Sequence, residues 1–85
     1  MSKPLVLTHH ARARVAERKI PVAWVEQTVR HPGWTEPEPF APSIERRFRA
    51  IPEFGGRILR VACVETDSHI RIITVTFDRD ARRKP

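Results

Sequence analysis

The chain of 85 residues contains no tyrosine, one cysteine and three glycines. The single cysteine, Cys63, cannot form an internal disulfide, so nothing in the sequence requires an oxidising compartment. No apolar run approaches the ~18 residues that a membrane-spanning helix needs, and the amino terminus becomes charged too early for a secretory signal. We therefore expect a protein of the cytoplasm that has no contact with a membrane.

The residue spacings of metal and phosphate sites are also missing. His9 and His10 are adjacent and would point apart on a helix, and neither an H-x-x-x-H nor a C-x-x-C pair occurs. The Gly55-Gly56 pair suits a hairpin connection better than a phosphate-binding loop. Cys63 falls in a predicted core strand, which disfavours it as a nucleophile. The sequence therefore predicts neither a metal nor a cofactor.

Positive charge is abundant and unevenly distributed. The net charge is +6, but residues 26–45 contain four glutamates and one arginine, so the rest of the chain carries +9. Most of this charge is arginine, whose planar guanidinium group suits phosphate or carboxylate partners. Such a basic body is typical of proteins that bind nucleic acid or an acidic protein.

Two short antiparallel helices are expected near the start of the chain. Thr8 is a suitable N-cap for a helix over residues 9–19. Pro21 fits the first turn of a second helix over residues 21–30, because the amide that proline lacks would be unpaired there. Valines spaced three and four residues apart give this second helix its buried stripe.

Three strands are expected over residues 44–51, 57–65 and 69–77, and residues 5–7 would add a short fourth strand. The segment 32–43 contains four prolines, which predicts an irregular loop. These elements predict an α+β fold with two N-terminal helices packed on a three- to four-stranded antiparallel sheet.

The expected domain spans residues 1–79, and residues 80–85 are expected to form a disordered basic tail. A two-residue turn at Asp67-Ser68 would pair the last two strands in regular alternation, with Val61 opposite Thr74. The sheet face turned away from the helices would then hold Arg60, Ala62, Val64, Arg71, Ile73, Val75 and Phe77.

Three basic residues of the first predicted helix, His10, Arg14 and Arg18, are spaced four apart and so fall along one side of it. Like charges in this arrangement repel, so carboxylates of the fold or phosphates of a partner must neutralise them. Arg18 lies nearest to the apolar stripe. We expect it to be a partly buried structural ion pair with Glu26, Glu45 or Glu65.

The pattern His10-Ala11-x-x-Arg14-x-x-x-Arg18-x-Ile20, the pair Trp24-Val25, and the strands R-I-L-R-V and I-I-T-V resemble the bacterial proteins grouped as domain of unknown function 4258. The order of elements is similar to the RelE, ParE and BrnT toxin-like fold, whose members include ribonucleases and proteins without nuclease activity. A RelE-like site that relies on tyrosine cannot be transferred, because the chain has none.

The resemblance implies a toxin-like protein that interacts with RNA or the ribosome, and an enzyme of this kind would be a metal-independent ribonuclease. Such cleavage needs a group that exchanges protons near neutral pH and a cation on the phosphate, so His10 and Arg14 are the candidate catalytic residues. The alternative is a non-catalytic module of the same fold that binds an acidic protein such as an antitoxin. In a third reading the arginines are only structural. The candidate nucleic-acid contacts are Arg12, Arg47, Arg49, Arg60 and Arg71.

Overall fold

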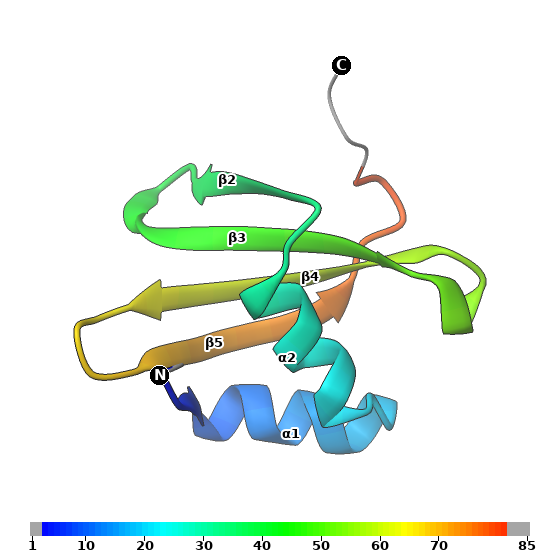
Figure 1. Cartoon of the computed structure of the whole chain (residues 1–85), viewed down its shortest axis with the longest axis horizontal. Coiled ribbons are helices and arrows are strands. Elements are labelled where there is room, and N and C mark those ends of the chain that lie inside the picture. The colour runs from blue at the N-terminus through cyan, green and yellow to red at the C-terminus, as the bar shows by residue number, and fades with distance from the viewer. Residues whose placement is uncertain (1–2, 82–85) are drawn as a thin grey trace.

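The computed structural model describes residues 3–81 and has an α+β architecture, in which two helices pack on a five-stranded sheet (Figure 1). The α+β class is therefore confirmed. The elements are β1 (Leu5–Leu7), α1 (His9–Arg18), α2 (Val22–Arg30), β2 (Trp34–Glu38), β3 (Ala41–Ile51), the 3-10 turn η1 (Pro52–Phe54), β4 (Arg57–Glu65) and β5 (Ile70–Phe77). Of the basic tail expected over 80–85, residues 82–85 lie outside the described residues.

The sheet is mixed, with the order β1-β5-β4-β3-β2. The short strand expected at residues 5–7 is confirmed, but β1 runs parallel to β5 and pairs Leu5 with Ile70. The other neighbouring strands are antiparallel. The prediction of a three- to four-stranded, wholly antiparallel sheet is thus wrong, because the long excursion from α1 through β4 separates β1 from β5 and allows a parallel pairing.

The segment 32–43 is not the irregular loop that its prolines predict. It contains β2 and the start of β3, and the two strands form a hairpin. Proline is compatible with β2 because β2 lies at the sheet edge, where one side of the strand needs no hydrogen-bond donors. Phe40 lies at the tip of the hairpin with 97% of its surface exposed.

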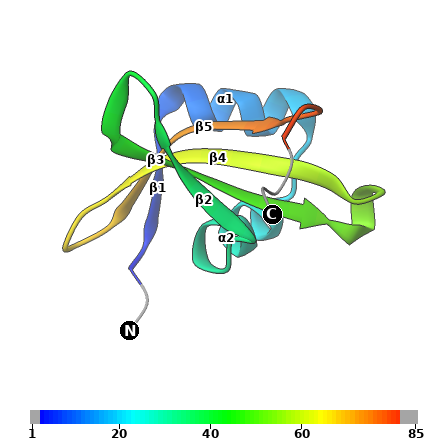
Figure 2. The ribbon, with the colours of Figure 1, turned by 90° about the horizontal axis from the view of Figure 1, so that it is seen from above.

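Both helices begin and end close to where the sequence predicts. Thr8 caps α1, because its Oγ1 accepts a hydrogen bond from the Ala11 amide at 3.2 Å. The chain leaves α1 at Lys19, in the left-handed region at φ 52°. Pro21 is the N-cap residue of α2, one position before the first turn. Figures 1 and 2 show α1 lying along β5, while α2 packs against β3 and β4.

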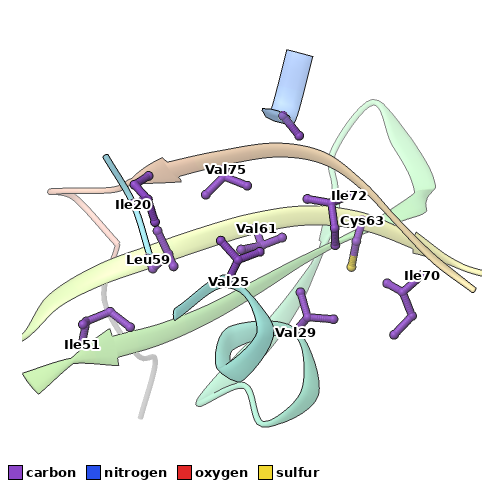
Figure 3. Close-up of a cluster of buried hydrophobic side chains, with 11 residues drawn as sticks. Ile20, Val25, Val29, Ile51, Leu59, Val61, Cys63, Ile70, Ile72 and Val75 are labelled. Atoms are coloured by element: carbon purple, nitrogen blue, oxygen red, sulfur yellow. The ribbon is translucent and has the colours of Figure 1, made fainter. Parts of the chain in front are cut away.

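The core fills the space between the helices and one face of the sheet (Figure 3). Its largest fully buried side chains come from the second helix and the three central strands. They are Val25, Val29, Ile51, Leu59, Val61, Ile72 and Val75.

The register of β4 and β5 differs from regular alternation. The pairing shifts between Ala62 and Cys63, which leaves Ile73 as an extra residue, so Val61 lies opposite Val75 rather than Thr74. Val75 is therefore buried in the core, and Phe77 packs against it, although the sequence predicts both on the other face. The bulge is fixed by the start of α1, because Thr8 Oγ1 donates to the Ile73 carbonyl at 3.2 Å.

Candidate nucleic-acid interface

Two of the expected nucleic-acid contacts, Arg47 and Arg49, are engaged within the fold. Arg47 has only 13% of its side chain exposed and donates to the Val29 carbonyl in the last turn of α2 at 2.9 Å. Arg49 donates to the His31 carbonyl, just beyond that helix, at 2.6 Å. Both guanidinium groups thus satisfy backbone carbonyls that the end of a helix leaves unpaired.

Arg47 is also the centre of an ion-pair cluster. It donates to Glu45 at 2.7 Å and to Glu65 at 2.8 Å, and Lys3 donates to the second oxygen of Glu65 at 2.8 Å. These hydrogen bonds, first from Arg47 and then from Lys3, lower the pKa of Glu65 to about 2. Burial alone would lower the pKa of Arg47, but the hydrogen bonds to Glu65 and Glu45 outweigh it and raise that pKa.

Acid should destabilise the fold through Glu65. Its folded pKa of about 2 lies below the ordinary value of 4.5, so the ionised carboxylate stabilises the folded state fully above pH 4.5, and this contribution is lost as the pH falls towards 2. We expect Glu65→Gln to be less stable than the native protein near neutral pH and to lose less stability on acidification. Thermal melts of both proteins across this range provide the measurement, and parallel curves would contradict the prediction.

Arg18 is exposed, contrary to the partial burial expected for it. Ile20, which is buried, fills the core position at the end of α1. The three carboxylates expected to pair with Arg18 bind other residues instead. Glu26 pairs with Arg30, Glu45 with Arg47, and Glu65 with Arg47 and Lys3. The structural ion pair is formed by Arg47 and not by Arg18. The sequence indicates it through Glu45, which is two positions earlier and therefore on the same face of the strand.

The two candidate catalytic residues lie on one side of α1. His10 is exposed in the first turn, and Arg14 is half-buried one turn later, about 6 Å further along the axis. Within residues 3–81 neither side chain makes a hydrogen bond or ion pair. Both are thus available to a partner.

On the sheet face turned away from α2, two strand arginines are paired with carboxylates. Arg60 donates to Asp78 at 3.0 Å. Arg46 donates through two nitrogens to Glu38, at 2.9 and 3.1 Å. Between these pairs lies an aromatic stack of Trp34 on Phe48, with ring centroids 4.8 Å apart and planes 1° from parallel.

The arginines divide into engaged and free groups. Residues 3–81 contain eleven arginines, of which four pair with carboxylates and Arg49 donates to a carbonyl. The other six have no carboxylate partner in this part of the chain. They form what we call the free-arginine band: Arg12, Arg14, Arg18, Arg57, Arg71 and Arg79.

Most of this band lies on two neighbouring elements. Three of its members lie on α1, Arg71 lies on β5, and Arg79 comes just after that strand. The α1 arginines are on the helix side of the sheet, because α1 packs along β5 (Figure 1). Arg71 lies opposite Val64 of β4 and Val6 of β1, so it belongs to the sheet face turned away from the helices. Arg57, at the start of β4, joins Arg79 at a hollow of about 620 Å³ where β5 ends. The sequence prediction omitted Arg57 and Arg79. Arg57 directly follows a turn and Arg79 lies in one, so neither is part of a regular spacing of residues along a helix or strand.

Three further features of residues 3–81 concern metal ligands, membrane spans and the cysteine. No three histidine, cysteine, aspartate or glutamate side chains gather there to hold a metal ion. No helix in the same residues is long and apolar enough to cross a membrane. Cys63 is buried, and burial raises the pKa of its thiol, which keeps it protonated and poorly nucleophilic.

Comparison with known proteins identifies the family. No curated protein and no solved structure matches this chain significantly. The family model described as "Domain of unknown function (DUF4258)" matches residues 7–77. That match runs from the last residue of β1 to the last residue of β5 and includes both helices, with His10, Arg14 and Arg18 on α1. The chain therefore belongs to the DUF4258 family.

Proposed function

We propose that this protein is a toxin-like RNA-binding protein whose contact surface is the free-arginine band. The observation that supports this most is the separation of charge in space. The acid-rich residues 26–45 form most of α2, all of β2 and the start of β3, and three arginines on these elements pair with glutamates. The elements α1 and β5 instead carry arginines without carboxylate partners in the described residues.

Phosphate is the partner that fits these arginines best. Each guanidinium group can donate two parallel hydrogen bonds to phosphate oxygens, and binding releases counterions from the nucleic acid. The only carboxylate on α1 is Glu17, so the helix itself cannot neutralise its three arginines. The choice of RNA follows the similarity in element order to the RelE, ParE and BrnT proteins.

Cleavage of the bound RNA is the finer hypothesis. His10 would take the proton of a 2′-hydroxyl, whose oxygen would bond to the adjacent phosphorus while the bond from phosphorus to the 5′-oxygen of the next nucleotide breaks. Water would protonate the leaving 5′-oxygen, and His10 would return its proton to the solvent. Arg14, one turn away on the same side of α1, would hold the phosphate. Both residues belong to the surface that binds the strand, because α1 carries half of the free-arginine band. No metal takes part in this reaction.

RNA binding should depend on the free arginines and not on the engaged ones. Changing Arg12, Arg14 and Arg71 together to glutamine removes three of the six, and we expect RNA affinity to fall by roughly 10- to 100-fold at low salt. The slope of log K against log salt should become shallower by about 2, because each phosphate contact on a single strand contributes about 0.7. Titration of labelled single-stranded RNA, followed by fluorescence anisotropy at several salt concentrations, measures both quantities.

Arg46→Gln is the matched control, since Arg46 is paired with Glu38 away from the band. An equal loss of affinity in Arg46→Gln would contradict the proposal. In the same assay, with a chelator present, His10→Ala should keep RNA binding and lose any cleavage. Intact RNA after incubation with the native protein would reject the ribonuclease hypothesis and leave RNA binding standing.

Binding of an acidic protein such as an antitoxin is a second candidate function, and one further observation favours it. Phe40 is almost fully exposed at the tip of the β2–β3 hairpin, where its ring is placed to act as an aromatic anchor in a pocket of a protein partner. If a protein partner contacts Phe40, the Phe40→Ser variant should bind that partner more weakly. Its affinity for RNA bound along α1 and β5 should equal that of the native protein.

A further inference from the structure

The hollow at the end of the free-arginine band combines aromatic rings with positive charge. It lies where β5 ends and the β3–β4 connection turns. The β3–β4 connection is on the right of Figure 1. Its volume of about 620 Å³ is within the usual range for small-molecule sites. Its lining consists of Arg18, Phe54, Gly56, Arg57, Ile58, Phe77, Asp78 and Arg79.

The apolar wall of the hollow is an aromatic cluster. The rings of Phe54 and Phe77 are 5.0 Å apart between centroids. Trp24 packs against both, at 5.7 Å from Phe54 and 6.4 Å from Phe77. The guanidinium carbon of Arg57 lies 4.8 Å from the centroid of the Phe54 ring, so a flat cationic group already covers an aromatic face.

The charge of the hollow is not balanced by its own carboxylate. Asp78 is the one acidic residue in the lining, and its two oxygens are occupied. One accepts from Arg60 at 3.0 Å, and the other accepts from the Asp80 amide at 2.9 Å. Arg18, Arg57 and Arg79 therefore face the hollow without a carboxylate partner in residues 3–81, which favours an anionic ligand.

We propose that this hollow binds one nucleotide, with its base stacked against Arg57 and Phe54 and its phosphate held by Arg18 and Arg79. Guanidinium planes and aromatic rings are the two groups on which unpaired bases stack, and arginine pairs match phosphate oxygens. A carboxylate metabolite without a ring would use the charges and leave the Arg57–Phe54 stack unused. The inference rests on the proposed RNA binding, because one nucleotide of the bound RNA strand would occupy the hollow.

The site is held in place by the fold around it. Phe54 belongs to η1, and the chain then turns through Gly55 and Gly56, both with positive φ, at 67° and 74°. The Gly56 amide closes this turn by donating to the Ile51 carbonyl at 2.9 Å. Phe77 projects from the end of β5 and packs against the core. A base would therefore meet a surface that needs little rearrangement, which lowers the entropic cost of binding.

Trp24 provides a natural reporter for this hollow, because its ring contacts Phe54. In a Trp34→Phe background Trp24 is the only tryptophan, so its fluorescence reports binding directly. We expect adenosine 5′-monophosphate to change this fluorescence in a saturable way. Adenosine and inorganic phosphate, which each supply half of the ligand, should bind at least about tenfold more weakly.

Variants then separate the hollow from the rest of the band. Arg57→Gln and Arg18→Gln should each weaken binding of the mononucleotide by about tenfold, whereas Arg71→Gln, on the far part of the band, should not change it. A mononucleotide that binds no more tightly than phosphate, or an Arg57→Gln variant with native affinity, would overturn the nucleotide site. The triple variant of Arg12, Arg14 and Arg71 could lose binding to long RNA while Arg57→Gln keeps the native affinity for the mononucleotide. That result would likewise reject the site while supporting the proposed function. Nucleotide binding by a native protein that fails to bind RNA would support the site and reject the proposed function.

Discussion

Val75→Asn should destabilise the protein by about 4 kcal/mol. The change removes a side chain that is only 1% exposed and places an amide among Leu59, Val61 and Ile72, where no partner is available in the described core. Loss of the buried apolar surface and the cost of an unpaired polar group contribute about equally to this figure. A domain of this length has a total stability of roughly 4–13 kcal/mol, so the variant should be close to unfolding. Urea denaturation followed by circular dichroism measures the difference.

The matched control is the same substitution two residues earlier. Ile73 is the extra residue of the bulge and is half-buried, so Ile73→Asn should cost only about 1 kcal/mol. Regular alternation without the bulge would put Ile73 and Val75 on the same face and give similar losses. Equal destabilisation of the two variants would therefore show that the β4–β5 register described above is wrong.

Arg47→Ala should cost about 3 kcal/mol, even though it removes a charged residue from a strand. The substitution leaves the Val29 carbonyl without its donor and removes the shared partner of Glu45 and Glu65. The two glutamates are 45% and 42% exposed and would be hydrated again, so most of the cost comes from the unpaired carbonyl and from the lost packing of the Arg47 side chain, which is only 13% exposed. For a domain of this size we expect the melting temperature to fall by roughly 10–20 °C.

Arg71→Ala is the appropriate comparison for this experiment. Arg71 is also a strand arginine, but it is exposed and has no carboxylate partner within residues 3–81, so its removal should change the stability by no more than about 0.5 kcal/mol. A melting temperature of Arg47→Ala within a degree or two of the native value would mean that the cluster around Arg47 contributes nothing net to folding.

The elements of the fold with local signals were predictable from the sequence. The Thr8 cap, both helices and the three long strands follow from capping chemistry and from the spacing of apolar residues. The bulge at Ile73 has no such signal, because it depends on a hydrogen bond from Thr8, 65 residues earlier in the chain. The prolines in 32–43 made the hairpin unpredictable. Pro37 lies in the edge strand β2, and Pro42 lies in the part of β3 before Glu45, where pairing with β4 begins, so neither proline interrupts an inner pair of strands.

The proposed binding surface was predictable only in part. The spacing of His10 and Arg14 correctly places both on one side of the first helix, but the spacing alone cannot show that Arg18 would remain exposed. That depends on which residue fills the core after the helix, and here it is Ile20. Arg47 and Arg49 differ from Arg71 in a tertiary feature, since only the first two lie beside the carboxyl end of α2.

The parallel pairing of β1 with β5 has a consequence for how the protein is made. The first strand and the cap of the first helix form hydrogen bonds with residues 70–73, and Thr8 and Ile73 are 65 residues apart in the sequence. A growing chain therefore cannot dock its basic first helix until β5 has been synthesised. A product released before residue 70 would lose the anchor of its amino-terminal elements together with its last strand. A truncation just before β5 should therefore abolish folding of the whole domain rather than remove one strand from it.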